Sequence, residues 1–139
     1  MEPLAGRRAI VTGAGRRRGI GAATALELAR QGADVLLCDL AGPLTEAERA
    51  CDDTIVTSAE EMEAVAGEIE GLGRRAVTRR VDVRRREDVE ACVDAAASEL
   101  GGVDILFNNA GTNAGAGPFE QATPEQWEMS WRANVMSVV

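Results

Sequence analysis

The 139-residue sequence predicts an α/β fold with a doubly wound parallel sheet, and three observations support this class. Short apolar runs alternate with longer Ala- and Leu-rich amphipathic stretches, which is the order of a parallel sheet with crossover helices. Hydrophobic residues make up 45% of the chain and aromatic residues only 3%, so the core must consist mainly of aliphatic side chains. Such small side chains allow helices to pack closely on a parallel sheet. The length corresponds to one domain, residues 1–139.

The first forty residues predict a strand, a tight turn, a helix and a second strand. The apolar run Arg8–Thr12 enters a glycine-rich turn, and the helical stretch Ile20–Arg30 follows it and closes at a glycine. A second apolar run, Val35–Cys38, completes a unit of the length that a right-handed crossover needs. The segment Ala41–Thr57 shows no periodicity and is expected to be irregular.

The rest of the chain repeats this alternation. Ser58 with Glu61 three residues later is a capping-box pattern, and Thr123-Pro124 with Gln126 is another. Between them, one apolar helix face comprises Val89, Cys92, Val93, Ala96, Ala97 and Leu100. The expected elements are a helix Ser58–Gly73, a strand Arg75–Val81, a helix ending at Leu100, a strand Val103–Phe107 and a helix running from Thr123 toward Val139. The chain would then hold about four strands and five helices and end inside the last helix.

Composition excludes several classes of function. The formal net charge of −8 gives no electrostatic reason to expect nucleic acid or an anionic membrane. No apolar stretch has the length of a secretory leader or a membrane span. The three cysteines, Cys38, Cys51 and Cys92, lack metal-ligand spacing, and their odd number favours reduced thiols. We therefore expect a soluble, cytoplasmic protein without a metal site.

Glycine and polar residues follow each of the four expected strands. Gly13, Gly15, Gly19 and Gly21 follow the first strand, Asp39 the second, Asp82 the third, and Asn108 to Gly111 the fourth. Ligands of doubly wound sheets bind at these strand ends. Glycines ahead of a helix let backbone N–H groups approach a pyrophosphate, and a carboxylate roughly 20 residues later can hold the adenosine ribose. A ligand-free glycine turn with ordinary polar strand ends is the alternative interpretation.

Taken together, these motifs resemble the short-chain dehydrogenase/reductase family over essentially the whole chain. The matching residues are Thr12-Gly13, Gly19-Ile20-Gly21, Asp39, Asp82-Val83, Asn108-Asn109-Ala110-Gly111 and Asn134. The resemblance implies a Rossmann-like fold in which Gly13, Arg18, Gly19, Ile20 and Gly21 surround the cofactor diphosphate. It further implies that Asp82 and Val83 contact adenine, that Asn108, Ala110 and Gly111 line the ribose and nicotinamide, and that Asn134 belongs to the catalytic set. One departure is that five residues, where the family usually has three, separate Gly13 from Gly19.

Asp39 predicts NAD as the cofactor rather than NADP. Its carboxylate can accept hydrogen bonds from both ribose hydroxyls, whereas a 2′-phosphate at the same place would meet a like charge. The arginine run Arg16-Arg17-Arg18 is the counterweight, because Arg18 could reach a 2′-phosphate. A solvated surface patch is the simpler interpretation of that run.

The resemblance implies an oxidoreductase that interconverts an alcohol and a ketone or aldehyde by hydride transfer to a nicotinamide cofactor, and intact members form homo-oligomers. The family uses a Tyr and a Lys for proton transfer, and this sequence contains no Tyr and no Lys. We therefore expect an amino-terminal cofactor-binding fragment with an uncovered apolar strand edge and low solubility. A non-catalytic NAD-binding module and a methyltransferase with an adenosyl cofactor remain as alternatives.

Overall fold

The computed structural model describes residues 2–46, 49, 58–115 and 117–139, and these form an α/β structure built on one parallel sheet. The strands are β1 (Arg8–Thr12), β2 (Asp34–Asp39), β3 (Ala76–Arg80) and β4 (Ile105–Phe107), in the spatial order β3-β2-β1-β4. The reversal of winding beside β1 confirms the predicted doubly wound topology.

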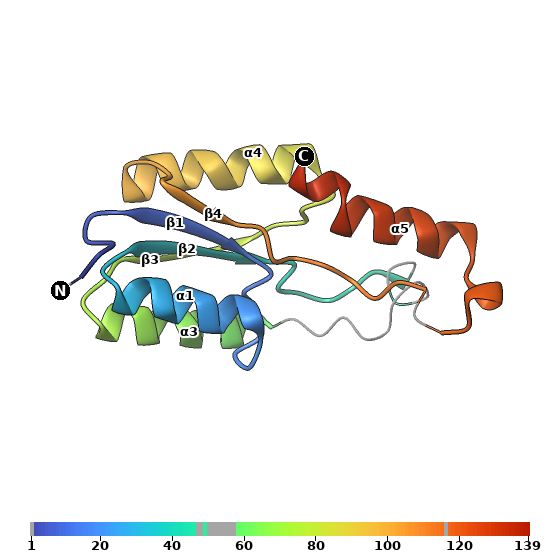
Figure 1. Cartoon of the computed structure of the whole chain (residues 1–139), viewed down its shortest axis with the longest axis horizontal. Coiled ribbons are helices and arrows are strands. Elements are labelled where there is room, and N and C mark those ends of the chain that lie inside the picture. The colour runs from blue at the N-terminus through green and yellow to red at the C-terminus, as the bar shows by residue number, and fades with distance from the viewer. Residues whose placement is uncertain (1, 47–48, 50–57, 116) are drawn as a thin grey trace.

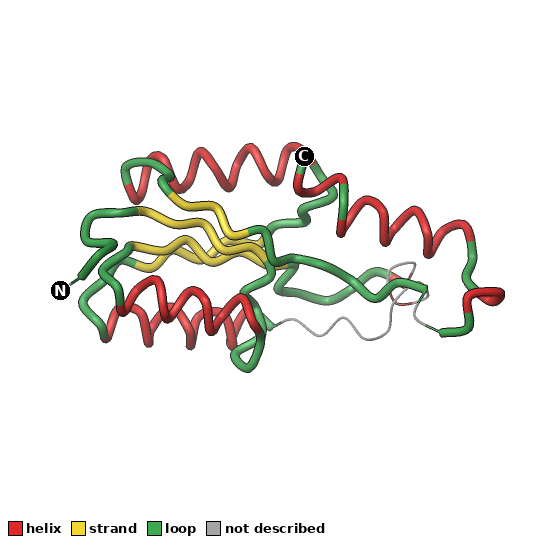
Figure 2. The backbone as a smooth tube through the Cα atoms, in the orientation of Figure 1, coloured by secondary structure: helices red, strands yellow, loops and turns green. Residues whose placement is uncertain are grey.

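Helices cover both faces of this sheet. The helices α1 (Ile20–Arg30) and α3 (Ala59–Gly71) lie on one face, and α4 (Arg86–Ala95) lies on the other (Figure 1). The helix α5 (Pro124–Asn134) extends past the carboxyl ends of the strands, next to the long connections that leave them (Figure 2). The space at these strand ends is therefore bordered by loops and by α5.

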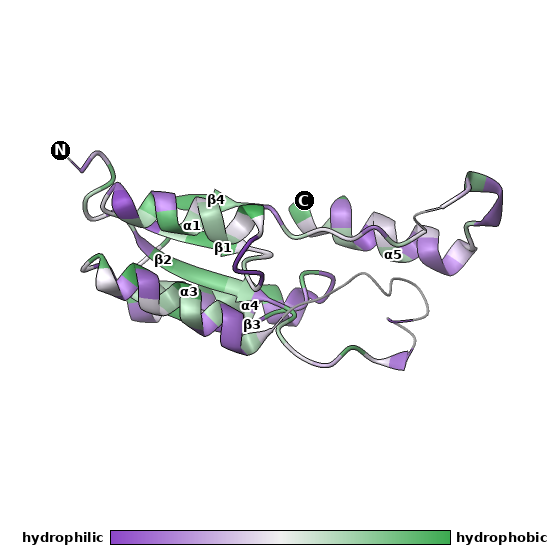
Figure 3. Ribbon diagram, turned by 90° about the horizontal axis from the view of Figure 1, so that it is seen from below, coloured by the Kyte–Doolittle hydropathy of each residue, from purple (hydrophilic) through white to green (hydrophobic). Residues whose placement is uncertain are grey.

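Strand residues alternate between two aliphatic cores. Ala9, Val11, Val35 and Leu37 pack against α1 and α3, in a core that also contains Met62, Val65 and Ile69. Ile10, Leu36 and Cys38 point the other way and pack against Cys92, Ala96 and Leu100. Because helices cover both faces of the sheet, β1 and β2 are apolar on both sides. Figure 3 shows these strands as hydrophobic ribbons behind helices that carry both hydrophilic and hydrophobic residues. Three alanines of α1, Ala22, Ala25 and Ala29, are buried, as expected for a thin helix close to the sheet.

Of the two predicted capping boxes, the one at α5 is complete and the one at α3 is only half formed. At α5 the Thr123 hydroxyl accepts from the Gln126 N–H at 3.3 Å, and the Thr123 N–H donates to the Gln126 side chain at 3.0 Å, so the box is complete. At α3 the Ser58 hydroxyl accepts from the Glu61 N–H at 3.2 Å. The Glu61 carboxylate, however, turns to a different partner, the backbone N–H of Arg17.

Some expectations about the third and last helices need correction. Val93 and Ala97 are exposed, because burial on this helix follows Cys92, Ala95, Ala96 and Leu100 at spacings of three and four residues. The last five residues of that helix, Ala96–Leu100, form a π-helical turn. The final helix ends at Asn134 and a 3₁₀ turn, Met136–Val138, follows instead of a continuous helix to Val139. The Ser137 hydroxyl donates to the Ala133 carbonyl at 2.7 Å and so satisfies one of the last helical carbonyls.

The predicted irregular segment Ala41–Thr57 falls largely outside the described residues. Its described part includes one helical hydrogen bond, from the Arg49 N–H to the Thr45 carbonyl at 3.0 Å. The predicted bounds of β1 are confirmed, and those of the other strands differ from the prediction by one or two residues at an end. The strand β4 is the most changed because it begins at Ile105 rather than Val103.

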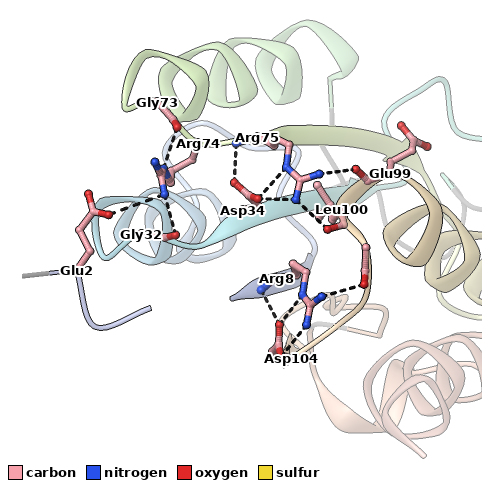
Figure 4. A network of polar contacts seen from close by, with 11 residues as sticks. Glu2, Arg8, Gly32, Asp34, Gly73, Arg74, Arg75, Glu99, Leu100 and Asp104 are labelled. Carbon is pink, nitrogen blue, oxygen red and sulfur yellow. Dashed lines mark hydrogen bonds and ion pairs between the residues drawn. The ribbon is translucent and has the colours of Figure 1, made fainter. Parts of the chain in front are cut away.

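Arginine and aspartate side chains tie the sheet together at the ends where its strands begin (Figure 4). The Arg8 guanidinium donates to Asp104 at 2.7 Å, which joins the start of β1 to the start of β4. Arg75 donates to Asp34 at 2.8 Å and also to the carbonyls of Glu99 and Leu100 at 2.9 and 2.8 Å. The hydrogen bonds from Arg8 hold the pKa of Asp104 well below its usual range. This end of the molecule is therefore occupied by structural ion pairs, and the opposite end is left for a ligand.

Apolar side chains are exposed on β4 and around α5. Leu106 of the edge strand is 56% exposed, and Trp127 and Trp131 of α5 are 55% and 54% exposed. Phe119 packs edge-on against Trp127 with ring centroids 5.7 Å apart, yet it remains exposed. In the described part of the chain, no helix combines the length and the apolar character needed to cross a membrane.

Candidate functional site

A cavity of about 400 Å³ lies at the carboxyl ends of the strands. The turn after β1, Asp39 at the end of β2, Asp82 after β3 and the loop after β4 all contribute to its lining. Its volume lies within the usual range of small-molecule sites. The residues predicted from the glycine motif and from the strand-end carboxylates therefore share one cavity.

The glycines of the β1–α1 turn are required by close packing. Gly13 has φ +69°, and a Cβ there would stand 2.8 Å from the Cα of Ala110. A Cβ on Gly21 would stand 2.5 Å from the Gly13 carbonyl oxygen. Gly21 is buried under this turn and does not line the cavity itself, so its role is to seat α1 against the turn.

The first turn of α1 is suited to an anionic ligand. No side chain caps the helix at Gly19, and no acidic residue lies in its first turn. The amino-terminal N–H groups of a helix need acceptors, and α3 and α5 take theirs from Ser58 and Thr123. At α1, a phosphate oxygen could supply the acceptors that no side chain provides.

Asp39 is held by two backbone N–H groups. Gly15 donates to its Oδ2 and Leu40 to its Oδ1, both at 2.7 Å. Burial raises the pKa of the Asp39 carboxyl above its ordinary value, and the two N–H groups and the Arg16 charge oppose that rise. A Cβ on Gly15 would lie 2.8 Å from the Asp39 Cβ, so glycine is needed for this approach. The carboxylate is thus oriented before any ligand arrives.

Asp82 is engaged by a neighbouring arginine. The Arg84 guanidinium donates to Oδ1 at 2.8 Å and to Oδ2 at 2.6 Å, and the two side chains are 15% and 16% exposed. Burial acts to raise the pKa of Asp82, but the hydrogen bonds and charge of Arg84 outweigh it and lower the pKa. Both residues and Val83 line the cavity. An ionised, partly buried ion pair therefore forms the wall beyond Asp39.

The loop after β4 is fastened to the end of β1. The Thr12 hydroxyl accepts from the N–H groups of Asn109 and Ala110, both at 3.0 Å. The Asn109 amide donates to the carbonyls of Thr12 and Gly13, also at 3.0 Å. Asn109 and Ala110 line the cavity, whereas Asn108 is exposed and does not. Asn109 therefore takes the inward position for which Asn108 was predicted.

Asn134 lies at the edge of the cavity and holds its wall. Its Oδ1 accepts from the Thr112 N–H at 2.8 Å, and its Nδ2 donates to the Thr112 carbonyl at 3.0 Å. A Cβ on Gly111 would lie 2.8 Å from Asn134 Oδ1. Thr112 and Gly111 line the cavity and Asn134 does not, so Asn134 connects α5 to the β4 loop.

Replacing Thr12 by valine is expected to lower the free energy of unfolding by about 2–3 kcal/mol. The change keeps the side-chain shape but leaves two partly buried N–H groups, those of Asn109 and Ala110, without their acceptor. Urea denaturation measures the effect. Thr78→Val, which removes only an exposed bond to Glu63, is the matched control, and an equal loss in both variants would contradict this role for Thr12.

Most of the predicted cofactor residues meet at the cavity. Those in its lining are Gly13, Arg18, Gly19, Ile20, Asp39, Asp82, Val83, Ala110 and Gly111, and those outside it are Gly21, Asn108 and Asn134. Gly15 was predicted only as one glycine of the turn and Thr12 only as part of the matching motif, and neither Arg84 nor Glu61 was predicted to take part in the site. The glycine spacing was the one signal that pointed to Gly15. The described residues contain no cluster of metal-binding side chains.

The chain is similar to known proteins over most of its length. Residues 13–139 match a family model described as "Enoyl-(Acyl carrier protein) reductase". The (-)-trans-carveol dehydrogenase of Rhodococcus erythropolis is 38% identical over 111 residues, which are 80% of this chain and 38% of that protein. The chain spans less than half the length of the curated relatives that it matches.

Solved structures superpose closely on the whole chain. Carveol dehydrogenase from Mycobacterium avium in complex with NAD matches with a TM-score of 0.87 and 30% identity, covering 99% of this chain and 47% of that one. A short chain dehydrogenase from Burkholderia cenocepacia in complex with NADP matches with a TM-score of 0.79 and 38% identity, covering 98% and 48%. Structures similar to this chain therefore include complexes with each of the two nicotinamide dinucleotides.

Proposed function

The chain belongs to the short-chain dehydrogenase/reductase family, and from that premise we propose that it is the NAD-binding part of an oxidoreductase that interconverts an alcohol and a ketone or aldehyde. One observation carries the proposal: the uncapped start of α1 and the Asp39 carboxylate line the same cavity. A dinucleotide needs both features at once, an anion site for its diphosphate and an acceptor for its adenosine ribose.

The residues present fit NAD in detail. Glycine at positions 13 and 21 lets the turn pack closely against the Ala110 backbone and against the start of α1, which places the backbone N–H groups of α1 beside the cavity for a diphosphate. Asp39 offers a preoriented carboxylate to the ribose hydroxyls, and Asp82 and Val83 would lie beside the adenine. Ile20 is 73% exposed at the cavity and gives a bound ring an apolar surface. When bound, the nicotinamide ring supplies the hydride donor or acceptor.

Asp39 favours NAD over NADP. The carboxylate stands where the ribose hydroxyls would bind, and a 2′-phosphate would add charge of the same sign. Arg16 and Arg18 also line the cavity and act in the opposite direction. The effect of Asp39 on cofactor preference is the larger one, because two backbone hydrogen bonds already hold its carboxylate in place. An exposed arginine, by contrast, loses side-chain entropy when it orders on a phosphate.

Transfer of the hydroxyl proton requires groups that these 139 residues do not include. A hydride moves together with a proton from the alcohol, and the sequence has no Tyr, Lys or His to take it. Asn134 holds the loop wall and would orient that region for catalysis. The second candidate function, favoured by this composition, is NAD binding without turnover.

The two unpaired buried thiols, Cys38 and Cys92, fit a reducing compartment such as the cytoplasm. The exposed apolar side chains of β4 and α5 are the surface on which further polypeptide would pack, from the same subunit or from another copy of it. Small-molecule alcohols and carbonyl compounds are the substrates that the proposed reaction implies.

Calorimetric titration of the chain with NAD tests the proposal. We expect saturable binding with one site per chain, and competition by ADP-ribose, which carries the diphosphate and both riboses. S-adenosylmethionine, the ligand of the alternative adenosyl-cofactor enzymes, should compete much more weakly than ADP-ribose because it has the adenosine but lacks the diphosphate. Displacement of NAD by S-adenosylmethionine but not by ADP-ribose would contradict the proposal.

A further inference from the structure

The three consecutive arginines of the β1–α1 turn point in two directions. Arg16 and Arg18 line the cavity, and they form no ion pair with any residue in the described ranges. Arg17 points to α3 instead, where its guanidinium binds Glu68 Oε1 through two nitrogens at 2.7 and 3.0 Å. The positive charge of Arg17 is therefore balanced by Glu68 of α3. In the part of the chain that the structure describes, Arg16 and Arg18 border the cavity without a carboxylate bound to their guanidinium groups.

The backbone of the same residue is also held from α3. The Arg17 N–H donates to Glu61 Oε2 at 2.7 Å, and the turn closes on itself through the Gly19 N–H and the Arg16 carbonyl at 2.8 Å. Glu61 and Glu68 lie two helical turns apart on α3, so they grip the turn at its main chain and at its side chain. We call these two carboxylates with Arg17 the α3 clamp.

The length of the turn gives the clamp its importance. Five residues separate Gly13 from Gly19, and a turn of this length at the surface has many conformations to lose when it orders on a ligand. The clamp fixes Arg17, the middle of the three arginines, in the ligand-free chain. Arg16 and Arg18 are then presented together, one residue on either side of the clamped position, beside the start of α1.

We propose that Glu61 and Glu68 are positioning residues for the cofactor diphosphate, which they serve by clamping Arg17 so that Arg16 and Arg18 face the bound phosphates. This inference rests on the proposed NAD site and deepens it. The two free guanidinium charges match the two negative charges of a diphosphate, while Glu68 removes the third positive charge. The clamp should therefore affect ligands with a diphosphate more than adenosine alone, although Gly15 of the same turn also donates to Asp39.

Binding measurements separate the clamp from general stability. In Glu61→Ala/Glu68→Ala the dissociation constant for NAD is expected to rise about five- to twentyfold, since two charge-assisted contacts are lost at an exposed site. Adenosine affinity, followed by ligand-observed NMR, should fall by a smaller factor than NAD affinity because adenosine carries no phosphate for Arg16 and Arg18 to contact. Glu70→Ala removes an exposed charge from the same helix and is the control. Glu61→Gln keeps an acceptor for the Arg17 N–H and should retain most of the affinity.

A second measurement needs no ligand. Trypsin cleaves after arginine, and the clamp should protect the Arg16–Arg18 turn, so mass spectrometry should show faster cleavage there in the double alanine variant than in Glu70→Ala. Equal cleavage rates, or equal NAD affinities in these two variants, would overturn the clamp. A wild-type chain that binds adenosine but not NAD would overturn both the clamp and the proposed function. Faster cleavage confined to the Arg16–Arg18 turn would uphold the clamp, whereas an acceleration shared equally by all arginine sites would assign the two carboxylates to general stability and overturn it.

Discussion

Replacing Gly13 by alanine is expected to abolish NAD binding and to lower the free energy of unfolding by about 2–4 kcal/mol. Gly13 has φ +69°, which strains any other residue, and its new Cβ would lie 2.8 and 2.9 Å from the Cα and N of Ala110. These are backbone atoms, so no side-chain rotation relieves the contact. Either the turn after β1 or the loop after β4 has to move, and both line the cavity.

Gly6 provides a matched control for this substitution. It has φ +74°, but a Cβ there would meet nothing within 4 Å. Gly6→Ala therefore carries the conformational strain alone, at about 1 kcal/mol. The difference between the two variants in urea denaturation measures the close packing of the turn against the β4 loop. Similar stabilities, with NAD binding retained in Gly13→Ala, would show that this packing does not form the site.

Replacing Asp39 by alanine is expected to raise the dissociation constant for NAD by about a hundredfold and to remove the preference over NADP. Two hydrogen bonds from ribose hydroxyls to a charged acceptor are lost, and each contributes about 1.5 kcal/mol or more. NADP has only its 3′-hydroxyl to donate to Asp39 and its 2′-phosphate is relieved of a like charge, so the variant should bind NADP no more weakly than NAD. Calorimetry with both dinucleotides measures the change, with Asp94→Ala, an exposed carboxylate on α4, as the control for net charge.

The same residue predicts a pH dependence of binding. Burial raises the pKa of Asp39, and the ionised form is the one that accepts both hydroxyls. NAD affinity should therefore be constant above this raised pKa and fall as the pH drops through it, starting at a higher pH than for an ordinary aspartate. In Asp39→Ala this step should be missing. If NAD affinity fell with pH by the same amount in Asp39→Ala, the titrating group would be a different residue.

The sequence predicted the fold well because local signals and burial agree along most of the chain. The short continuous apolar runs of β1 and β2 and the caps at Ser58 and Thr123 depend on neighbouring residues only, and each prediction is confirmed. Val93 shows the limit of this approach. It continues the apolar face in sequence, yet it is exposed because the sheet contacts only a narrow stripe of α4.

The site was predicted in outline and less well in its contacts. Strand-end positions are readable because parallel strands end at one edge, so Gly13, Asp39 and Asp82 were found from their order in the chain. The contacts of Gly15 with Asp39 and of Glu61 with Arg17 join residues far apart in sequence. A local pattern assigned Glu61 to a capping box and carried no information about its distant partner. The inward position of Asn109 instead of Asn108 depends on its bonds to β1 in the same way.

A crystal structure of the chain soaked with NAD tests the central claim most directly. We expect the diphosphate within hydrogen-bonding distance of the first N–H groups of α1, and both hydroxyls of the adenosine ribose on the two oxygens of Asp39. A dinucleotide bound with its adenosine away from β2, or with its phosphates away from the glycine turn, would contradict the account.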